Sequence, residues 1–191
     1  MRKGRFLWLF NLILAMILFN ACPGGAQTSD GVSPEPERRG PVITHAFAVE
    51  KGYYGIPWKI YLEAEDPGGQ MLKIALVVDQ VGYGRYPTDW IYLKPRYQKH
   101  FKGYIQWNTF SSKSSYLPEW TQITLTVSVV DKAGKESNEV IFPYTFEITP
   151  GQYAYTPPPP FDHEDLTRLG YIAIDLHYPG REDEHRGPGT D

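Results

Sequence analysis

Apolar and polar side chains alternate along most of the middle of the chain, and this alternation predicts β-strands with one buried face. Every second side chain is apolar in residues 58–66, WKIYLEAED, and in residues 72–79, LKIALVVD. Residues 123–131, ITLTVSVVD, repeat the pattern. A period of two is typical of a half-buried strand, whereas an amphipathic helix has a period near 3.6. We therefore expect a strand in each of these three runs.

Shorter runs extend the strand pattern on both sides. We expect further strands within residues 41–50, 90–93, 104–110 and 139–149. The sequence Asp66-Pro67-Gly68-Gly69 predicts a turn, and the runs on its two sides are expected to form a hairpin. Pro143 has no N–H to donate, which indicates an edge position or a bulge. About seven strands without an intervening amphipathic helix predict an antiparallel sandwich of two sheets.

One turn carries a family resemblance. Residues Val129–Ser137, VVDKAGKES, resemble the F–G hairpin of bacterial immunoglobulin-like extracellular domains, in which an Asp-x-Ala-Gly-Asn-x-Ser turn joins the last two strands. Gly134 can take the left-handed backbone conformation, and Asp131 and Ser137 can bond loop amides. The resemblance implies an immunoglobulin-like or cadherin-like sandwich over residues 41–150. It implies no reaction, because such sandwiches mostly serve as spacers or binding modules.

The start of the chain has the layout of an export signal. Arg2, Lys3 and Arg5 precede the apolar residues 6–21, and the apolar run ends at the only cysteine of the chain, followed by Pro-Gly-Gly. A basic start, a short apolar core and a small residue are typical of a signal peptide, whereas a spanning helix needs about 20 apolar residues. We therefore expect residues 1–21 to be a signal peptide that is removed.

The junction Phe19-Asn20-Ala21-Cys22 resembles the lipobox of bacterial lipoproteins, with Phe19 in the place of the usual Leu. The resemblance implies that Cys22 carries acyl chains such as palmitate and becomes the N-terminus of a lipid-anchored protein. Pro23 follows instead of aspartate, which implies the outer membrane, facing the periplasm, in a cell with two membranes. An ordinary secretory signal with an incidental cysteine is the alternative. A single cysteine forms no intramolecular disulfide bond.

Composition divides the exported chain into three parts. Residues 22–40 are rich in Gly, Pro and charged side chains and predict a flexible tether. Residues 41–150 hold eleven acids and eleven bases, as expected of a globular surface. Residues 151–191 are acidic and open near a run of four prolines, which favours an extended arm.

Two elements are expected within this Pro-rich, acidic tail. Residues Phe161–Leu169, FDHEDLTRL, favour a short helix with Asp162 as its cap and Gly170 as its stop. Residues 171–176, YIAIDL, form an apolar run of strand length. This run either folds back onto a sheet edge or pairs with a partner by strand addition.

Searches for catalytic and metal-binding patterns favour a non-enzyme without cofactors. The sequence has no nucleophile elbow, zinc-protease motif, phosphate-binding loop or paired cysteines, and the serines of residues 111–115 have no positioned base. Four acids resemble the calcium-binding ends of cadherin-like sandwiches, with solvated turn carboxylates as the alternative. These are Glu63, Glu65, Asp66 and Asp131. The spacing of three tail histidines fits no closed zinc site, so we expect no metal there. These are His163, His177 and His185.

Residues 82–107 combine eight aromatic rings with five basic side chains and one acid. A stretch of this length cannot direct every ring into the core. We therefore expect some of the rings to line a surface. The predicted ligand-binding side chains are Arg85, Trp90, Arg96, Tyr97 and Lys99. Rings and cations together can stack on sugars or bind an anionic envelope polymer or protein partner. The alternative is that half the rings cap an open end of the sandwich while lysines shield an edge strand.

Charge excludes one class of partner. The formal net charge of −3 becomes −6 once residues 1–21 leave, because three bases and no acid leave with them, so the basic footprint of a nucleic-acid-binding protein is absent. The sequence thus predicts a membrane-anchored lipoprotein of the cell envelope that acts as a non-catalytic binding or structural module for an envelope protein or polymer. The alternatives are a carbohydrate-binding module that uses residues 82–107 and an envelope hydrolase.

Overall fold

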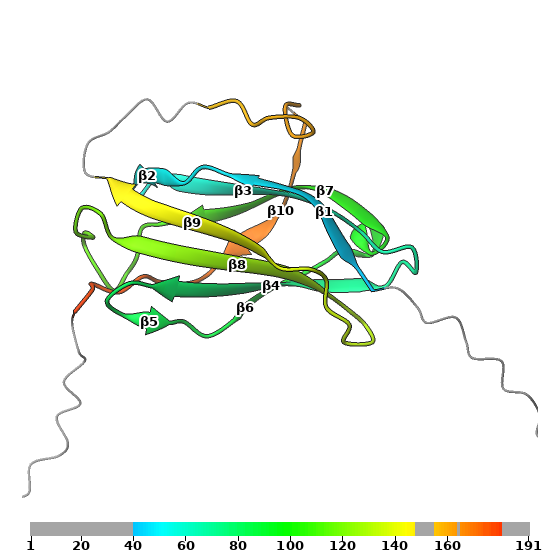
Figure 1. Cartoon of the computed structure of the whole chain (residues 1–191), viewed down its shortest axis with the longest axis horizontal. Coiled ribbons are helices and arrows are strands. Elements are labelled where there is room, and N and C mark those ends of the chain that lie inside the picture. Colours follow the sequence, from blue (N-terminus) through cyan, green and yellow to red (C-terminus); the bar gives the residue numbers. More distant parts are fainter. Residues whose placement is uncertain (1–39, 148–154, 164, 181–191) are drawn as a thin grey trace, which may run out of the picture. The chain divides into compact units, whose positions relative to one another are not determined.

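Two sheets pack face to face in the computed structural model, which describes residues 40–147, 155–163 and 165–180 (Figure 1). The strands are β1 (Val42–Ala48), β2 (Lys51–Tyr53), β3 (Pro57–Glu65), β4 (Met71–Gln80), β5 (Gly84–Arg85), β6 (Asp89–Tyr92), β7 (His100–Asn108), β8 (Gln122–Asp131), β9 (Val140–Glu147) and β10 (Thr167–Ile172). The helical turn η1 (Pro95–Tyr97) precedes β7. The described part of the chain contains no helix long and apolar enough to cross a membrane. The expected signal peptide, Cys22 and the expected tether as far as residue 39 lie outside the described residues.

The strand order is that of an immunoglobulin-like sandwich. The first sheet has the order β1-β3-β7-β10, and the second has the order β2-β9-β8-β4-β5, with β6 also paired to β4. In immunoglobulin notation β1, β3 and β7 correspond to strands A, B and E, whereas β4, β8 and β9 correspond to C, F and G. Two pairs are parallel, β10 with β7 and β2 with β9, and the others are antiparallel. The predicted all-β immunoglobulin-like sandwich is confirmed.

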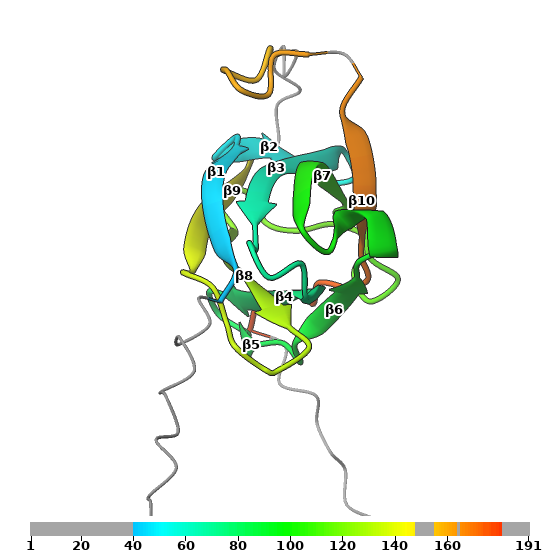
Figure 2. The ribbon, with the colours of Figure 1, turned by 90° about the vertical axis from the view of Figure 1, so that its right-hand side faces the viewer.

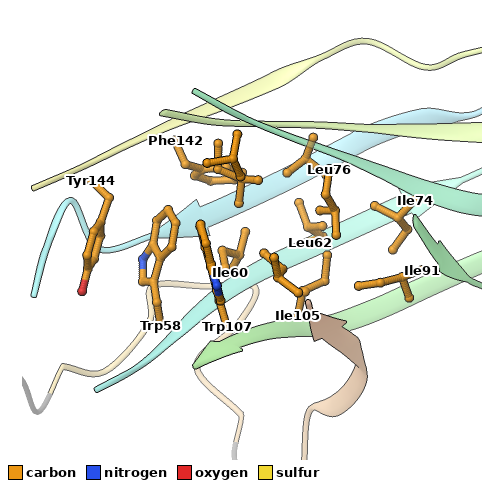
Figure 3. Close-up of a cluster of buried hydrophobic side chains, with 14 of the residues drawn as sticks. Trp58, Ile60, Leu62, Ile74, Leu76, Ile91, Ile105, Trp107, Phe142 and Tyr144 are labelled. Carbon is orange, nitrogen blue, oxygen red and sulfur yellow. The ribbon is translucent and has the colours of Figure 1, made fainter. Parts of the chain in front are cut away.

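The core lies between the two sheets and follows the alternation of the sequence. Trp58, Ile60 and Leu62 of β3 are at most 1% exposed and face buried side chains of the second sheet, such as Leu76 (Figure 3). The ring centroids of Trp58 and Tyr144 lie 4.3 Å apart across the core. Burial of each large apolar side chain stabilises the fold by roughly 1.5–3 kcal/mol relative to exposure.

The expected hairpin at Asp66–Gly69 is wrong. β3 lies in the first sheet and β4 in the second, so the turn crosses between sheets. The Asp66 carboxylate accepts hydrogen bonds from the backbone N–H groups of Gly68 (2.8 Å) and Gln70 (2.7 Å), and the φ of Gly69 is 64°. Alternation places both apolar faces inward in a hairpin and in a crossing turn alike, so the sequence pattern does not distinguish them.

The β8–β9 turn has the geometry that its resemblance implies. Oδ1 of Asp131 accepts hydrogen bonds from the N–H groups of Ala133 and Lys135, both at 2.8 Å. Gly134 has a φ of 80°, and Oγ of Ser137 accepts from an amide of β8 at 2.9 Å. Both predicted polar side chains therefore bond backbone amides, and the hairpin is confirmed.

Pro143 lies at an edge position, as predicted. It pairs with Thr124 on β8, whereas the second neighbour of β9, the short strand β2, reaches only Thr145–Glu147. At Pro143 the strand β9 therefore has a neighbour on one side only, where the missing N–H is tolerated.

The C-terminal segment forms a strand where a helix was expected. β10 begins at Thr167 and contains Gly170, so the helix predicted over Phe161–Leu169 and the cap at Asp162 are wrong. The strand runs parallel to β7 from Thr167 opposite Gly103 to Ile172 opposite Trp107. Isolated short helices are marginal in water, whereas the strand pairs with β7 and buries Ile172 in the core. The strand expected over residues 171–176 is thus shifted towards the N-terminus, because only residues 171 and 172 belong to β10. Of the two expected fates for this run, it folds back onto a sheet edge.

β10 occupies the place that strand D takes beside strand E in an immunoglobulin fold. It stands at the side of the sandwich between β7 of the first sheet and β6 of the second (Figure 2). Ile172 is 6% exposed and Leu176 is fully buried. Upstream, Phe161 is 1% exposed and packs on Tyr61 of the first sheet. The folded unit thus includes tail residues that lie beyond the expected domain end at residue 150.

We predict that Gly170→Val destabilises the domain by about 1–3 kcal/mol, because a Cβ at Gly170 would lie 2.6 Å from Cγ2 of buried Ile91. Arg168→Ala, on the exposed surface of the same strand, is the matched control and should change the free energy of unfolding by less than about 0.5 kcal/mol. Urea denaturation of both variants measures the difference. Equal stabilities would show that β10 does not contribute to the core.

Candidate binding surfaces

Two of the predicted ligand-binding residues lie on strands that pair with β4. Arg85 on β5 makes two hydrogen bonds of 2.9 Å to the carboxylate of Asp79, which raise its pKa further. Trp90 on β6 is 40% exposed, and Nζ of Lys73 lies 3.6 Å from the centroid of its ring. Both side chains are engaged by neighbours on the second sheet.

The other three lie at the end of the sandwich that holds the Asp66 turn, around η1. The Arg96 guanidinium lies 4.7 Å from the ring centroid of Tyr97, and Tyr97 packs partly buried against the core. Lys99 is exposed, and its carbonyl accepts a hydrogen bond from the Asp66 amide at 2.9 Å. Arg85 pairs beside Asp79 near one end of β4, whereas Lys99 bonds the Asp66 turn at the other end, so the five candidates do not gather at one place. Their role in binding stays a prediction.

Three of the four acids considered for calcium bond other groups of the domain. Asp66 and Asp131 are at most 1% exposed, so they are not the solvated turn carboxylates of the alternative, and each accepts bonds from turn amides. Glu65 is exposed at the end of β3. Burial opposes the ionisation of Glu63, but hydrogen bonds from His100 and Lys102 outweigh it and lower its pKa. The described residues contain no group of three or more His, Cys, Asp or Glu that could hold a metal ion.

Two tail histidines lie in the described residues, and His185 lies outside them. Nε2 of His163 is 3.7 Å from its neighbour Asp162. His177 stacks on Tyr83 with ring centroids 4.5 Å apart. Its backbone is held from both sides, because its N–H donates to the Tyr86 hydroxyl at 2.9 Å and its carbonyl accepts from the Gln80 amide at 2.7 Å. His177 is therefore part of an ordered aromatic cluster.

The opposite end of the sandwich holds a surface that the sequence reasoning missed. Figure 1 shows that β4 and β7 end, and β3 and β8 begin, at this end of the sandwich. The loops there carry large apolar side chains that are between 41% and 66% exposed. We call this surface the aromatic end, and it comprises Ile56, Val81, Tyr83, Phe110, Tyr116 and Trp120. Three of these side chains come from loop 109–121. Apolar side chains in a long loop without periodicity were the available signal. Phe110 was expected within a strand, in residues 104–110, and otherwise only the serines of the loop were considered.

Internal hydrogen bonds fix loop 109–121. The buried Ser111 hydroxyl donates to the carbonyl of Leu176 at 2.6 Å. The Tyr54 hydroxyl donates to the carbonyl of Ser114 at 2.5 Å and accepts from the Ser111 amide at 2.8 Å. These bonds join the loop to Tyr54 and Leu176, so its exposed side chains project from a rigid base.

The backbone at Trp120 is strained. Its φ of 68° lies in the left-handed region, where a bulky side chain is unusual and costs roughly 1–3 kcal/mol. A hydrogen bond of 2.8 Å from its N–H to the Phe146 carbonyl holds this conformation, yet the ring is 59% exposed. Nζ of Lys51 lies 5.8 Å from the ring centroid. The fold thus maintains a strained backbone to present an indole ring to solvent, which is typical of a functional position.

Tyr86 joins the aromatic end to the C-terminal segment. Its hydroxyl donates to Oε1 of Gln80 at 2.5 Å and accepts from the His177 amide. Burial raises the pKa of Tyr86 to about 12.

We predict that the domain loses about 2–3 kcal/mol of stability between pH 10 and pH 12 through Tyr86. A pKa raised by folding means that the stabilisation is complete below the unfolded value near 10 and is lost as the pH rises through 12. Tyr86→Phe should lose less over this range, although not nothing, because burial also raises the pKa of Tyr155. Urea denaturation at pH 9 and pH 12 measures both slopes, and identical slopes would contradict the assignment.

Comparison with models of protein families gives no match, and comparison with curated protein sequences gives none either. Among solved structures, the chain is similar to the PKD domain of an M14-like peptidase from a Thermoplasmatales archaeon, with 17% identity, 58% of this chain and 98% of that chain covered, and a TM-score of 0.39. It is also similar to the CARDB domain of a Pyrococcus furiosus protein in complex with di-metal ions, with 8% identity, coverages of 60% and 100%, and a TM-score of 0.34. The strand order of the chain itself defines the immunoglobulin-like fold.

Proposed function

We propose that this chain is a membrane-anchored lipoprotein of the cell envelope whose immunoglobulin-like sandwich is a non-catalytic binding module. The observation that carries the binding role is the aromatic end, where six large apolar side chains are 41–66% exposed. Exposed apolar side chains gathered on one surface are typical of interaction sites, and aromatic side chains dominate the binding energy of protein interfaces. An envelope protein or polymer is the expected partner.

The path of the chain supports a binding surface that faces away from the anchor. Gly40 lies beside the β8–β9 turn, where a Cβ on it would be 3.3 Å from Cβ of Lys135. The domain therefore begins at the end of the sandwich opposite to the aromatic end. A flexible tether over residues 22–40 would span roughly 20–25 Å. With Cys22 in the outer membrane, the aromatic end would be free to face a partner in the periplasm.

The anchor is proposed from the sequence. A basic start, the apolar residues 6–21 and Cys22 follow one another in the order of a lipoprotein signal. Acyl chains on Cys22 would hold the exported domain at the membrane without a spanning helix.

We predict that Cys22→Ala moves the protein from the membrane fraction to the soluble fraction of the envelope, because the proposed anchor is lipid. Immunoblots of separated fractions measure the shift, and Cys22→Ser is a second variant that also lacks the acylated thiol. Unchanged membrane retention of both variants would rule out the lipid anchor.

We predict that Trp120→Gly combined with Phe110→Ser lowers capture of the envelope partner by about 30-fold, the loss expected at a hot spot. Glycine accepts the φ of 68° at position 120, so the variant should fold with unchanged or higher stability. Pull-down of solubilised envelope proteins and of isolated cell-wall polymer, with thermal unfolding in parallel, measures binding and folding separately.

A matched control tests the other candidate surface. Trp90→Ala with Arg96→Ala removes an exposed ring and a cation outside the aromatic end. This double variant should bind as the parent does. Loss of binding in the control, with full binding by the Trp120 and Phe110 variant, would assign the interaction to Trp90 and Arg96 instead.

A further inference from the structure

A pocket of about 510 Å³ opens at the aromatic end, within the volume range of small-ligand sites. It is lined by Lys113, Ser114, Ser115, Tyr116, Tyr178 and Gly180. Two segments far apart in the sequence form it, loop 109–121 and residues 173–180. The Ser112 hydroxyl joins them by donating to the Asp175 carboxylate at 2.6 Å.

The two tyrosines give the pocket an aromatic wall. The rings of Tyr116 and Tyr178 lie edge to face, with centroids 5.4 Å apart and an interplanar angle of 74°. A hydrogen bond between their side chains raises the pKa of Tyr178. Tyr116 is 60% exposed, so its ring is accessible to a ligand. The Ser114 hydroxyl donates to the Tyr116 carbonyl and holds that residue in place.

The remaining groups are polar. Ser115 and Lys113 are exposed, and they bring a hydroxyl and an ammonium group beside the tyrosine rings. Among the described residues that line the pocket, Lys113 is the only charged side chain. The lining thus combines one exposed ring with hydroxyl groups and a positive charge. That combination matches a flat ligand with an apolar face, a rim of hydroxyls and a negative charge.

We propose that this pocket binds a short segment of an acidic glycan. The Tyr116 ring stacks on the C–H face of one sugar, the Ser115 and Tyr178 hydroxyls bond sugar hydroxyls, and Lys113 pairs with a carboxylate. The proposal rests on the proposed function as an envelope binding module and names the chemical class of its ligand. The hydrogen bonds that fix loop 109–121 before binding lower the entropy lost on association.

Calorimetric titration of the mature chain in detergent with trigalacturonate and with neutral chitotriose tests the proposal. We expect trigalacturonate to bind at least tenfold more tightly than chitotriose, and Lys113→Ala to abolish that preference. Tyr116→Ser should weaken trigalacturonate binding at least tenfold, whereas Tyr116→Phe, which keeps the ring, should retain most of it. Tyr92→Ser, which removes a 67% exposed ring from β6, is the matched control and should bind as the parent does.

Three results would overturn the proposal. Equal affinity for the two saccharides would remove the acidic assignment, and binding that is unaffected by Tyr116→Ser would place the ligand elsewhere. Absence of binding to both saccharides would reject the glycan site. If envelope capture still depends on Trp120 in that last case, the proposed binding function stands and only the glycan assignment fails.

Discussion

The fold depends on closure of the sandwich by its C-terminal segment. One hydrogen bond shows this: the indole N–H of Trp107, which is fully buried in the core, donates to the carbonyl of Ile174 at 3.0 Å. An immunoglobulin-like sandwich that lacks strand D would leave the free edge of β7 and the side between its sheets open to water. β10 closes both, and the residues after it satisfy the indole. A buried N–H without a partner would cost roughly 1–3 kcal/mol, so the C-terminal segment is integral to the core.

The same closure builds the surface that we assign to binding. Residues after β10 hold loop 109–121 through the bond from Ser111 to Leu176, and they hold the end of β4 through the bond from Gln80 to His177. The aromatic side chains therefore project from segments that are joined by hydrogen bonds to backbone carbonyls. Such a base allows a strained residue, Trp120, to stay in place with its ring in solvent. The proposed binding surface and the stability of the core thus depend on one segment.

Alternation along the chain was sufficient to predict the long strands and the fold class, because the burial of one face sets a period of two in the sequence. Local turn chemistry also predicted the β8–β9 hairpin through Asp131 and Ser137. The crossing turn at Asp66 and the strand β10 depend on pairing between distant segments, which no local pattern encodes. The grouping of Arg85 with Lys99 was inferred from nearness in sequence, and the fold separates them. The aromatic end escaped prediction because exposed loop rings have no periodicity.

Hydrogen–deuterium exchange of the backbone amides in β10 tests the central claim, that the C-terminal segment completes the core. The account predicts that the amides of Thr167–Ile172 bonded to β7 exchange as slowly as those of β8, because both strands open only with the whole domain. Exchange in β10 at the rate of an unfolded peptide, with β8 still protected, would contradict it.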